Sequence, residues 1–170
     1  MNTRESFRVR AYRTTDAHTT FQIFHRAITV TASADYTAEQ ITAWAQTERW
    51  DIAAWDLSMR RRKSYVAVIG EQVVGFSDIS DDGYIDMLYV SPDVARRGVA
   101  RELLTFLEHQ ARSHGAKRLT ANVSITARKF FEALGFQIVA EQHPVLDDVV
   151  FTNFRMMKLL GTDHQPNVNR

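Results

Sequence analysis

The residues best suited to do chemistry lie within residues 87–104. An apolar run that ends at Val90 is followed by a proline-marked turn and then by a basic, glycine-containing segment at residues 95–100. A loop of this kind ahead of a helix leaves backbone N–H groups without partners at the positive end of the helix dipole. Such a spot binds anions, most simply a phosphate or pyrophosphate. The segment therefore predicts a strand, a loop and a helix around a phosphorylated ligand.

The same segment supplies positive charge. The candidates for holding the anion are Arg96, Arg97, Gly98, Val99, Ala100 and Arg101. An ordinary solvated turn is the alternative, and of the two adjacent arginines we expect one rather than both to contact phosphate. The chain has neither a Walker lysine nor a Gly-x-Gly-x-x-Gly run, which weighs against a nucleotide-binding loop.

Composition is that of an ordinary globular protein. The 170 residues are 45% hydrophobic and 24% charged, enough apolar material for one core. With 21 basic and 20 acidic residues the formal charge is +1, so any anion site must be local. The absence of cysteine excludes disulfides, thiolate metal sites and a cysteine nucleophile. The six histidines have no ligand-like spacing, so we expect no metal.

We expect a single domain over residues 1–160 and a flexible polar tail over residues 161–170. Residues 1–13 are polar and charged, unlike a signal peptide, and no apolar run approaches the ~20 residues that span a bilayer. A cytoplasmic protein with no membrane partner is therefore the expectation. The basic run at residues 60–63 has no interleaved aromatic residues, so we interpret it as a solvated helix end rather than a nucleic-acid site.

Periodicity and turn signals give the order of the elements. Alternating apolar residues predict strands at residues 7–13, 65–69, 73–79, 84–90, 118–123, 136–139 and 149–158. Capping residues and helical spacing predict helices that begin near Asp16, Thr37, Asp51, Gly98 and Thr126. This order is typical of an α/β or α+β fold, with a mixed sheet covered by helices on both faces.

Two motifs in this order resemble the GNAT superfamily of acetyl-CoA-dependent N-acetyltransferases. The strand-and-loop run at residues 88–100 is similar to the family's Leu-x-Val-x-Pro and Gln/Arg-x-x-Gly-x-Gly/Ala segments. Residues 124–136 are similar to its Asn-x-x-Ala-x-x-x-Tyr-Glu-x-x-Gly-Phe run. The resemblance covers residues 65–160 well and the N-terminal third by element order. It implies a mostly antiparallel sheet of about six or seven strands with a central splay.

The resemblance also implies acetyl-CoA as the acetyl donor. Its pantetheine arm would pair with backbone groups of Leu88, Tyr89 and Val90 as though it were another strand. Its pyrophosphate would lie on the amides of residues 96–101, and Phe130 and Phe131 would pack near the thiol end. A primary amine would attack the thioester, with small-molecule and peptide acceptors both open.

Three positions depart from the family pattern. Ala95 replaces Gln or Arg, Ser124 replaces Asn, and Phe131 stands where many members have a tyrosine that serves as general acid. The first two leave a backbone-mediated cofactor site intact. We expect Ser124 to replace the missing acid, or the reaction to run without one; a helix-capping role for Ser124 is the alternative. A non-catalytic acyl-CoA-binding regulatory module is the competing interpretation of the whole chain.

The amine must lose a proton, and the developing oxyanion needs a donor. Tyr84, Asp86 and Leu88 share one face of a predicted strand by the two-residue period. Asp86 is the predicted base, directly or through water, with Tyr84 as the alternative catalytic residue. A purely structural role on a water-lined strand face is the other interpretation of Asp86. A backbone N–H at Leu88 or Tyr89 is the predicted oxyanion donor.

The N-terminal third carries the tryptophans Trp44, Trp50 and Trp55, with Tyr36 nearby. In the superfamily this segment builds the acceptor side, and aromatic faces attract cations. Tyr36 and Trp44 are therefore the predicted substrate contacts, and burial of the tryptophans in a helical core is the alternative. The resemblance also makes the C-terminal strands candidates for pairing across a homodimer.

Overall fold

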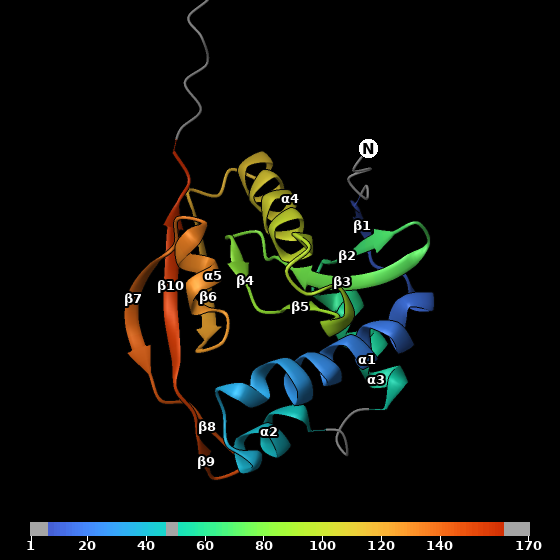
Figure 1. Ribbon diagram of the computed structural model, residues 1–170. Helices are drawn as coiled ribbons and strands as arrows, with labels where there is room; N and C mark the ends of the chain where they lie inside the picture. The colour runs from blue at the N-terminus through green and yellow to red at the C-terminus, as the bar shows by residue number, and fades with distance from the viewer. Residues whose placement is uncertain (1–6, 47–50, 162–170) are drawn as a thin grey trace, which may run out of the picture.

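The computed structural model describes residues 7–46 and 51–161 of the chain. Its first sheet is antiparallel and has the strand order β1 (Phe7–Ala11), β2 (Ser64–Ile69), β3 (Gln72–Asp78) and β5 (Leu88–Val90). Its second sheet has the order β4 (Tyr84–Ile85), β6 (Arg118–Ser124), β10 (Asn153–Leu159) and β7 (Gln137–Gln142). β4 is parallel to β6, whereas the other pairs are antiparallel. The two sheets part where β4 gives way to β5 (Figure 1).

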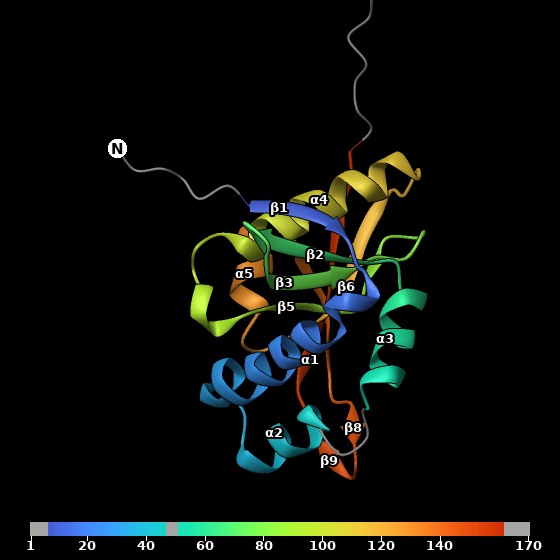
Figure 2. The same cartoon turned by 90° about the vertical axis from the view of Figure 1, so that its right-hand side faces the viewer.

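Helices cover both faces of the first sheet. The α-helices of the described residues are α1 (Ala17–Arg26), α2 (Ala38–Ala45), α3 (Ile52–Arg61), α4 (Val99–Ser113) and α5 (Arg128–Ala133). α1 and α3 pack on one face of the sheet and α4 packs on the other (Figure 2). The short elements are a π-helix after α1 (Ala27–Thr31), 3-10 turns (Thr14–Asp16, Ala32–Ala34, Pro92–Val94), β8 (Val145–Leu146) and β9 (Val149–Val150).

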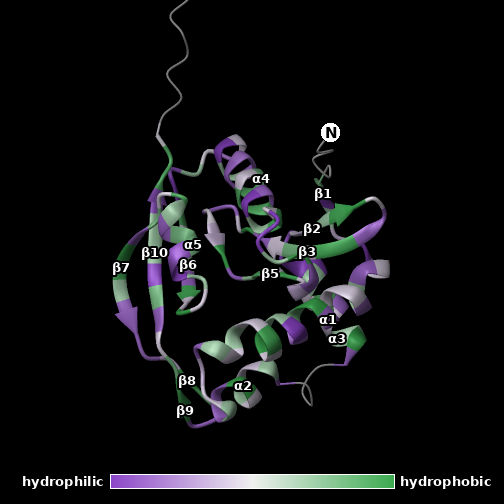
Figure 3. Cartoon of the chain, viewed as in Figure 1, coloured by the Kyte–Doolittle hydropathy of each residue, from purple (hydrophilic) through white to green (hydrophobic). Residues whose placement is uncertain are grey.

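The alternation of side chains along β2 explains why this sheet is covered twice. Val66 and Val68 are buried against α1 and α3, and Ala67 between them is buried against α4. Figure 3 shows the hydrophobic character of β3 beside it. Trp55 of α3 is 0% exposed, and its Nε1 donates to Thr20 Oγ1 at 3.0 Å. The interpretation of Trp55 as a core residue is therefore confirmed.

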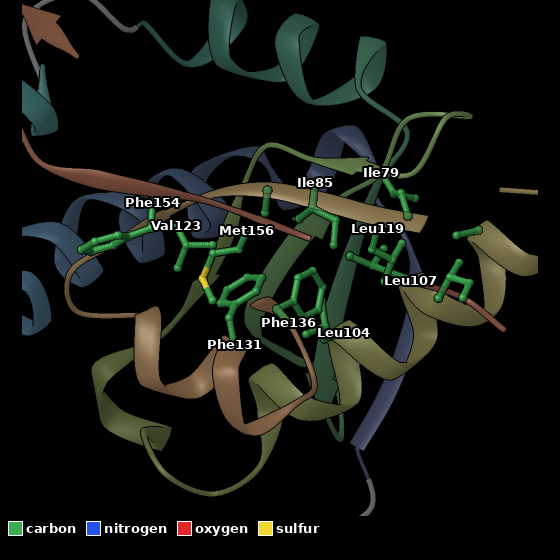
Figure 4. Packing of buried hydrophobic residues seen from close by; sticks show 13 residues of the cluster. Ile79, Ile85, Leu104, Leu107, Leu119, Val123, Phe131, Phe136, Phe154 and Met156 are labelled. Atoms are coloured by element: carbon green, nitrogen blue, oxygen red, sulfur yellow. The ribbon is translucent and has the colours of Figure 1, made fainter. Parts of the chain in front are cut away.

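A second core joins α4 and α5 to the second sheet. Leu104 and Leu107 of α4 meet Phe131 of α5, together with Phe136 and Met156 (Figure 4). Phe131 is 3% exposed, and its ring centroid lies 5.0 Å from that of Phe136. Because α4 contacts both sheets, its packing holds them at the angle at which they diverge.

The single strand predicted over residues 84–90 is wrong, because β4 and β5 belong to different sheets. The carboxylate of Asp78 accepts the backbone N–H of Asp86 at 2.9 Å and that of Met87 at 3.3 Å. A side chain thus replaces a neighbouring strand at these two residues, which interrupts the ladder. The predicted final strand is likewise divided into β9 and β10. With these divisions and β8, the described residues form ten strands rather than the expected six or seven.

The mixed sheet, the helices on both faces and the central splay are confirmed. β7 lies at an edge of the second sheet and leaves Val139 54% exposed, while pairing across a homodimer stays a prediction. Among residues 7–46 and 51–161, no helix is both long enough and apolar enough to cross a membrane. Trp50 and the tail from residue 162 lie outside the described residues.

Candidate active site

A cleft of about 510 Å³ opens between the diverging strands β5 and β6. Its walls come from β5, the first turn of α4, the end of β6 and the start of α5, with Trp44 of α2 at its far side. Among its lining residues are Leu88, Tyr89, Val90, Arg96, Gly98, Val99, Ala100, Arg101, Phe130 and Phe131. The structure therefore brings together most of the residues predicted to hold the cofactor. Arg97 is the one of that set that does not line the cleft.

The chain turns sharply before α4, and the residues that begin this helix line one end of the cleft. Gly98 has a φ of 94° and Arg96 a φ of 64°, so the chain turns through two left-handed residues there. The bond from Glu102 N to Gly98 O at 3.0 Å begins the helical ladder. The N–H groups of Val99, Ala100 and Arg101 come before this first bond and have no acceptor within the helix. N–H groups in this position attract anions. A Cβ built on Gly98 would meet no atom within 4 Å, so the cradle is open.

The hydrogen bonding of β5 decides which backbone groups face the cleft. Ser91 N donates to Val74 O at 2.8 Å, and Met87 O accepts from Asp78 N at 3.3 Å. Met87 and Ser91, the odd-numbered residues on either side of β5, therefore turn their backbone groups towards β3. Successive backbone groups of a strand point to opposite sides. The N–H and C=O groups of Leu88 and Val90 therefore turn away from β3, towards the cleft. Of the two residues proposed as oxyanion donor, this orientation favours Leu88.

A polar cluster lies at the other end of the cleft. Asp86 follows β4 directly and lines the cleft, and the Tyr84 hydroxyl donates to Asp86 Oδ1 at 3.2 Å. Asn122 Nδ2 in turn donates to the Tyr84 hydroxyl at 3.4 Å. Asn122 lines the cleft and was not predicted, although its place between the buried residues Ala121 and Val123 marks it as the outward-facing member of that strand. The predicted pair Tyr84 and Asp86 is thus in direct contact.

Two further charged residues support Asp86 and were also missed. The Arg62 guanidinium forms an ion pair with Asp86, and its Nη1 lies 3.6 Å from Asp78 Oδ2. The interpretation of residues 60–63 as a solvated helix end is therefore wrong for Arg62, whose charge points into the fold. Asp78 is 3% exposed, and burial raises its pKa to about 6 against the opposing pull of the Met87 N–H and of Arg62. A lone carboxylate in a mostly apolar strand was the available signal for Asp78.

Ser124 lies where β6 meets the turn before α5. Its Oγ accepts the Ala127 N–H at 3.1 Å, so it closes that turn, and it lines the cleft as well. The structural and the catalytic interpretations of Ser124 are thus compatible, because the hydroxyl hydrogen is not used by the bond to Ala127. Phe131 lines the cleft from within the core and offers no titrating group.

The predicted acceptor residues occupy different layers. Trp44 lines the cleft, and the Tyr36 ring packs behind it with a centroid distance of 5.2 Å. The Tyr36 hydroxyl donates to Thr152 O at 3.2 Å and accepts the Ile125 N–H at 2.9 Å, which braces the end of β6. Tyr36 is 9% exposed, so a direct contact with substrate stays a prediction. The part of the chain that the structure describes holds no group of three or more His, Asp or Glu residues suited to a metal ion.

Comparison with known proteins identifies the family. The model of the acetyltransferase (GNAT) domain matches residues 32–158. This chain belongs to the GNAT acetyltransferase family. YafP of Escherichia coli K12, named as an uncharacterized N-acetyltransferase, is 40% identical over 151 residues, which cover 89% of this chain and 95% of that protein. The resemblance inferred from the two sequence motifs is therefore confirmed.

Solved structures of GNAT proteins agree. A GCN5-related N-acetyltransferase from Rhodopseudomonas palustris has a TM-score of 0.85 and 31% identity, covering 90% of this chain and 95% of that one. The PaiA N-acetyltransferase from Thermoplasma acidophilum, solved with coenzyme A, has a TM-score of 0.74 at 18% identity, covering 91% of this chain and 99% of that one, and shows the fold alone. The GNAT-like fold is confirmed, and the chain is an acyltransferase of this family.

Proposed function

We propose that this GNAT protein transfers acetyl from acetyl-CoA to a primary amine, with both molecules bound at once. The observation that carries the proposal is the continuity of one cleft from the amides that begin α4 to the carboxylate of Asp86. The first end suits a pyrophosphate and the second suits an amine. The coenzyme A bound by PaiA supports the choice of donor, since that protein shares the fold.

The residues of the cleft fit acetyl-CoA. The open cradle at Gly98 and the lining side chains Arg96 and Arg101 match the negative charge of a pyrophosphate. The outward backbone groups of Leu88 and Val90 match a pantetheine arm lying along the strand edge. Phe130 and Phe131 supply an apolar wall near the place expected for the thiol. Acetyl-CoA supplies an activated acetyl group: the C–N bond of the amide forms, the C–S bond breaks, and the sulfur leaves with the electron pair.

Asp86 takes the proton that the amine must lose, directly or through one water. Arg62 and the Tyr84 hydroxyl hold its carboxylate in place. The Leu88 N–H stabilises the charge that develops on the carbonyl oxygen. The Ser124 hydroxyl is the proton donor to the departing sulfur, a role that the missing tyrosine at position 131 leaves open.

Calorimetric titration of the purified protein tests the donor site. We expect saturable binding of acetyl-CoA and much weaker binding of ATP and NAD. Release of free CoA thiol in the presence of a panel of amines, small molecules and peptides, then tests the transfer. Equal or tighter binding of ATP would contradict the cofactor assignment. Tight acetyl-CoA binding without amine-dependent thiol release would instead favour the acyl-CoA-binding regulatory module.

A further inference from the structure

A second cavity of about 410 Å³ adjoins the cleft and shares Asp86 with it. It lies where the end of α3, the end of β3 and the start of β4 meet, and its charged lining is Arg61, Arg62, Lys63, Asp78, Asp81 and Asp86. α3 lies on the opposite side of the molecule from the loop that precedes α4 (Figure 2). An acetyl donor bound at the loop before α4 would therefore leave this side of Asp86 open, and a molecule in the second cavity would contact Asp86 from there.

A buried, unsatisfied carboxylate oxygen in this cavity indicates a ligand. Asp78 is 3% exposed and lines the cavity, yet its Oδ2 forms no hydrogen bond within the described residues. Its nearest cation is Arg62, with Nη1 3.6 Å away. A buried carboxylate oxygen without a hydrogen bond is costly, and a bound N–H donor would remove that cost.

The charges of the cavity balance, which restricts the kind of ligand it takes. It is lined by three cations and three carboxylates, and Arg62 pairs with Asp86 while Lys63 pairs with Asp81. A simple ammonium ion between Asp86 and Asp78 would compete with Arg62 for both of its carboxylate partners and leave this half-buried guanidinium short of an anion, which is unfavourable. A molecule with both an ammonium and a carboxylate group would satisfy both, because the displaced Arg62 gains a new anion. The ligand that keeps every charge paired is therefore a zwitterion.

We propose that this second cavity binds the acceptor and that the acceptor is a small free amino acid. This inference rests on the proposed acetyl transfer. The amino group lies between Asp86 and Asp78, and the carboxylate lies on the cations at the end of α3, Arg61, Arg62 and Lys63. The amine loses its proton to Asp86 before it attacks. Acetylation removes the positive charge, so the product is an anion that the two carboxylates repel, and Arg62 pairs with Asp86 again.

Matched ligands test the zwitterion. We would measure CoA release with alanine, leucine, phenylalanine and glutamate, each compared with its amide and with the corresponding decarboxylated amine. We expect kcat/KM to be at least tenfold higher for one or more free amino acids than for their matched partners. Faster transfer to the amides or to the decarboxylated amines would overturn the proposal while leaving acetyl transfer intact. Preferred transfer to a peptide N-terminus would also overturn it.

Matched variants test the location. Arg61→Gln and Lys63→Gln should each raise KM for the amino acid about tenfold, with the KM for acetyl-CoA and the rate on the decarboxylated amine unchanged. Arg60→Gln is the control, because Arg60 has the same charge on the same helix but pairs with Asp56 Oδ2 at 2.9 Å, outside the cavity. An equal effect of the three variants would place the carboxylate elsewhere and overturn the assignment.

A binding measurement separates this inference from the proposed reaction. Calorimetry of alanine and of alaninamide, each titrated into the protein saturated with CoA, needs no turnover. Tighter binding of alanine, weakened by Lys63→Gln, would support the cavity even if no acetyl transfer were detected. Equal affinity for the two ligands would overturn it even if acetyl transfer to other amines were found.

Discussion

Asp78 accepts the backbone N–H of Asp86 at 2.9 Å, and both carboxylates lie against the guanidinium of Arg62. The Asp78 side chain thus takes the place of a strand at the residues between β4 and β5, and the two sheets part there. The same contact presents the Asp86 side chain between the cleft and the second cavity. One buried carboxylate thus serves both the splay of the fold and the placement of the predicted base.

The buried carboxyl of Asp78 should make stability depend on pH. Burial raises its pKa from an ordinary value of 3.8 to about 6, so the native state binds more protons than the unfolded state between those values. Stability therefore falls as pH rises through this window, by about 3 kcal/mol at roughly 1.4 kcal/mol per pKa unit. Asp78→Asn removes this titration and keeps an acceptor for the two N–H groups.

Urea denaturation at pH 4, 5, 6 and 7 checks this expectation. The free energy of unfolding of Asp78→Asn relative to the native protein should increase between pH 4 and pH 7, and most of the change should fall between pH 4 and pH 6. A constant difference across that range would show that the carboxyl of Asp78 titrates at its ordinary pKa.

Gly98→Asp should weaken acetyl-CoA binding more than tenfold with only a modest loss of stability. The substitution places a carboxylate in the open cradle and forces a side chain onto a φ of 94°. The conformational strain costs about 1 kcal/mol, whereas charge repulsion at the pyrophosphate should weaken binding more than tenfold in calorimetry.

The matched control is Gly70→Asp, in the turn between β2 and β3. Gly70 also has a positive φ, 59°, and open space around it, but it lies outside the cleft. It should lose similar stability and keep its affinity for acetyl-CoA. Retained affinity in Gly98→Asp would mean that the loop does not bind the pyrophosphate.

Asp86→Asn should slow acetyl transfer by about 10²-fold below the pKa of the amine, because the amine then loses its proton only to solvent. Acetyl-CoA affinity should be unchanged, since Asp86 lies at the far end of the cleft from the loop. Steady-state rates from pH 6 to pH 10 provide the measurement, with Asp82→Asn in the exposed turn before β4 as control. A pH–rate profile that matches the unsubstituted protein would reject Asp86 as the base.

Two substitutions of Ser124 should separate its structural and catalytic roles. Ser124→Ala removes the acceptor for the Ala127 N–H at 3.1 Å and should lower the free energy of unfolding by about 1 kcal/mol. Ser124→Asn keeps an acceptor there and should be nearly as stable as the native protein. If the hydroxyl protonates the leaving sulfur, both variants should lower kcat. Loss of activity only in the alanine variant would assign Ser124 a structural role.

The parts of this protein that depend on local chemistry can be predicted from its amino-acid sequence. The glycine loop at Gly98 and its following helix come from a short run of residues, and alternation along β2 requires cover on both faces of its sheet. Two motifs in order were enough to indicate the family. Each of these signals is short in range, because backbone conformation and side-chain period are set by near neighbours.

The assembly of the site, in contrast, depends on contacts between residues far apart in the sequence. Arg62 follows α3, Asp78 ends β3, Asp86 follows β4 and Asn122 belongs to β6, so no local pattern relates them. The break between β4 and β5 was hidden for the same reason, since residues 84–90 alternate like one strand while the group that interrupts them is a distant carboxylate. Burial of a charged side chain depends on which elements cover it, and these elements come from distant parts of the sequence.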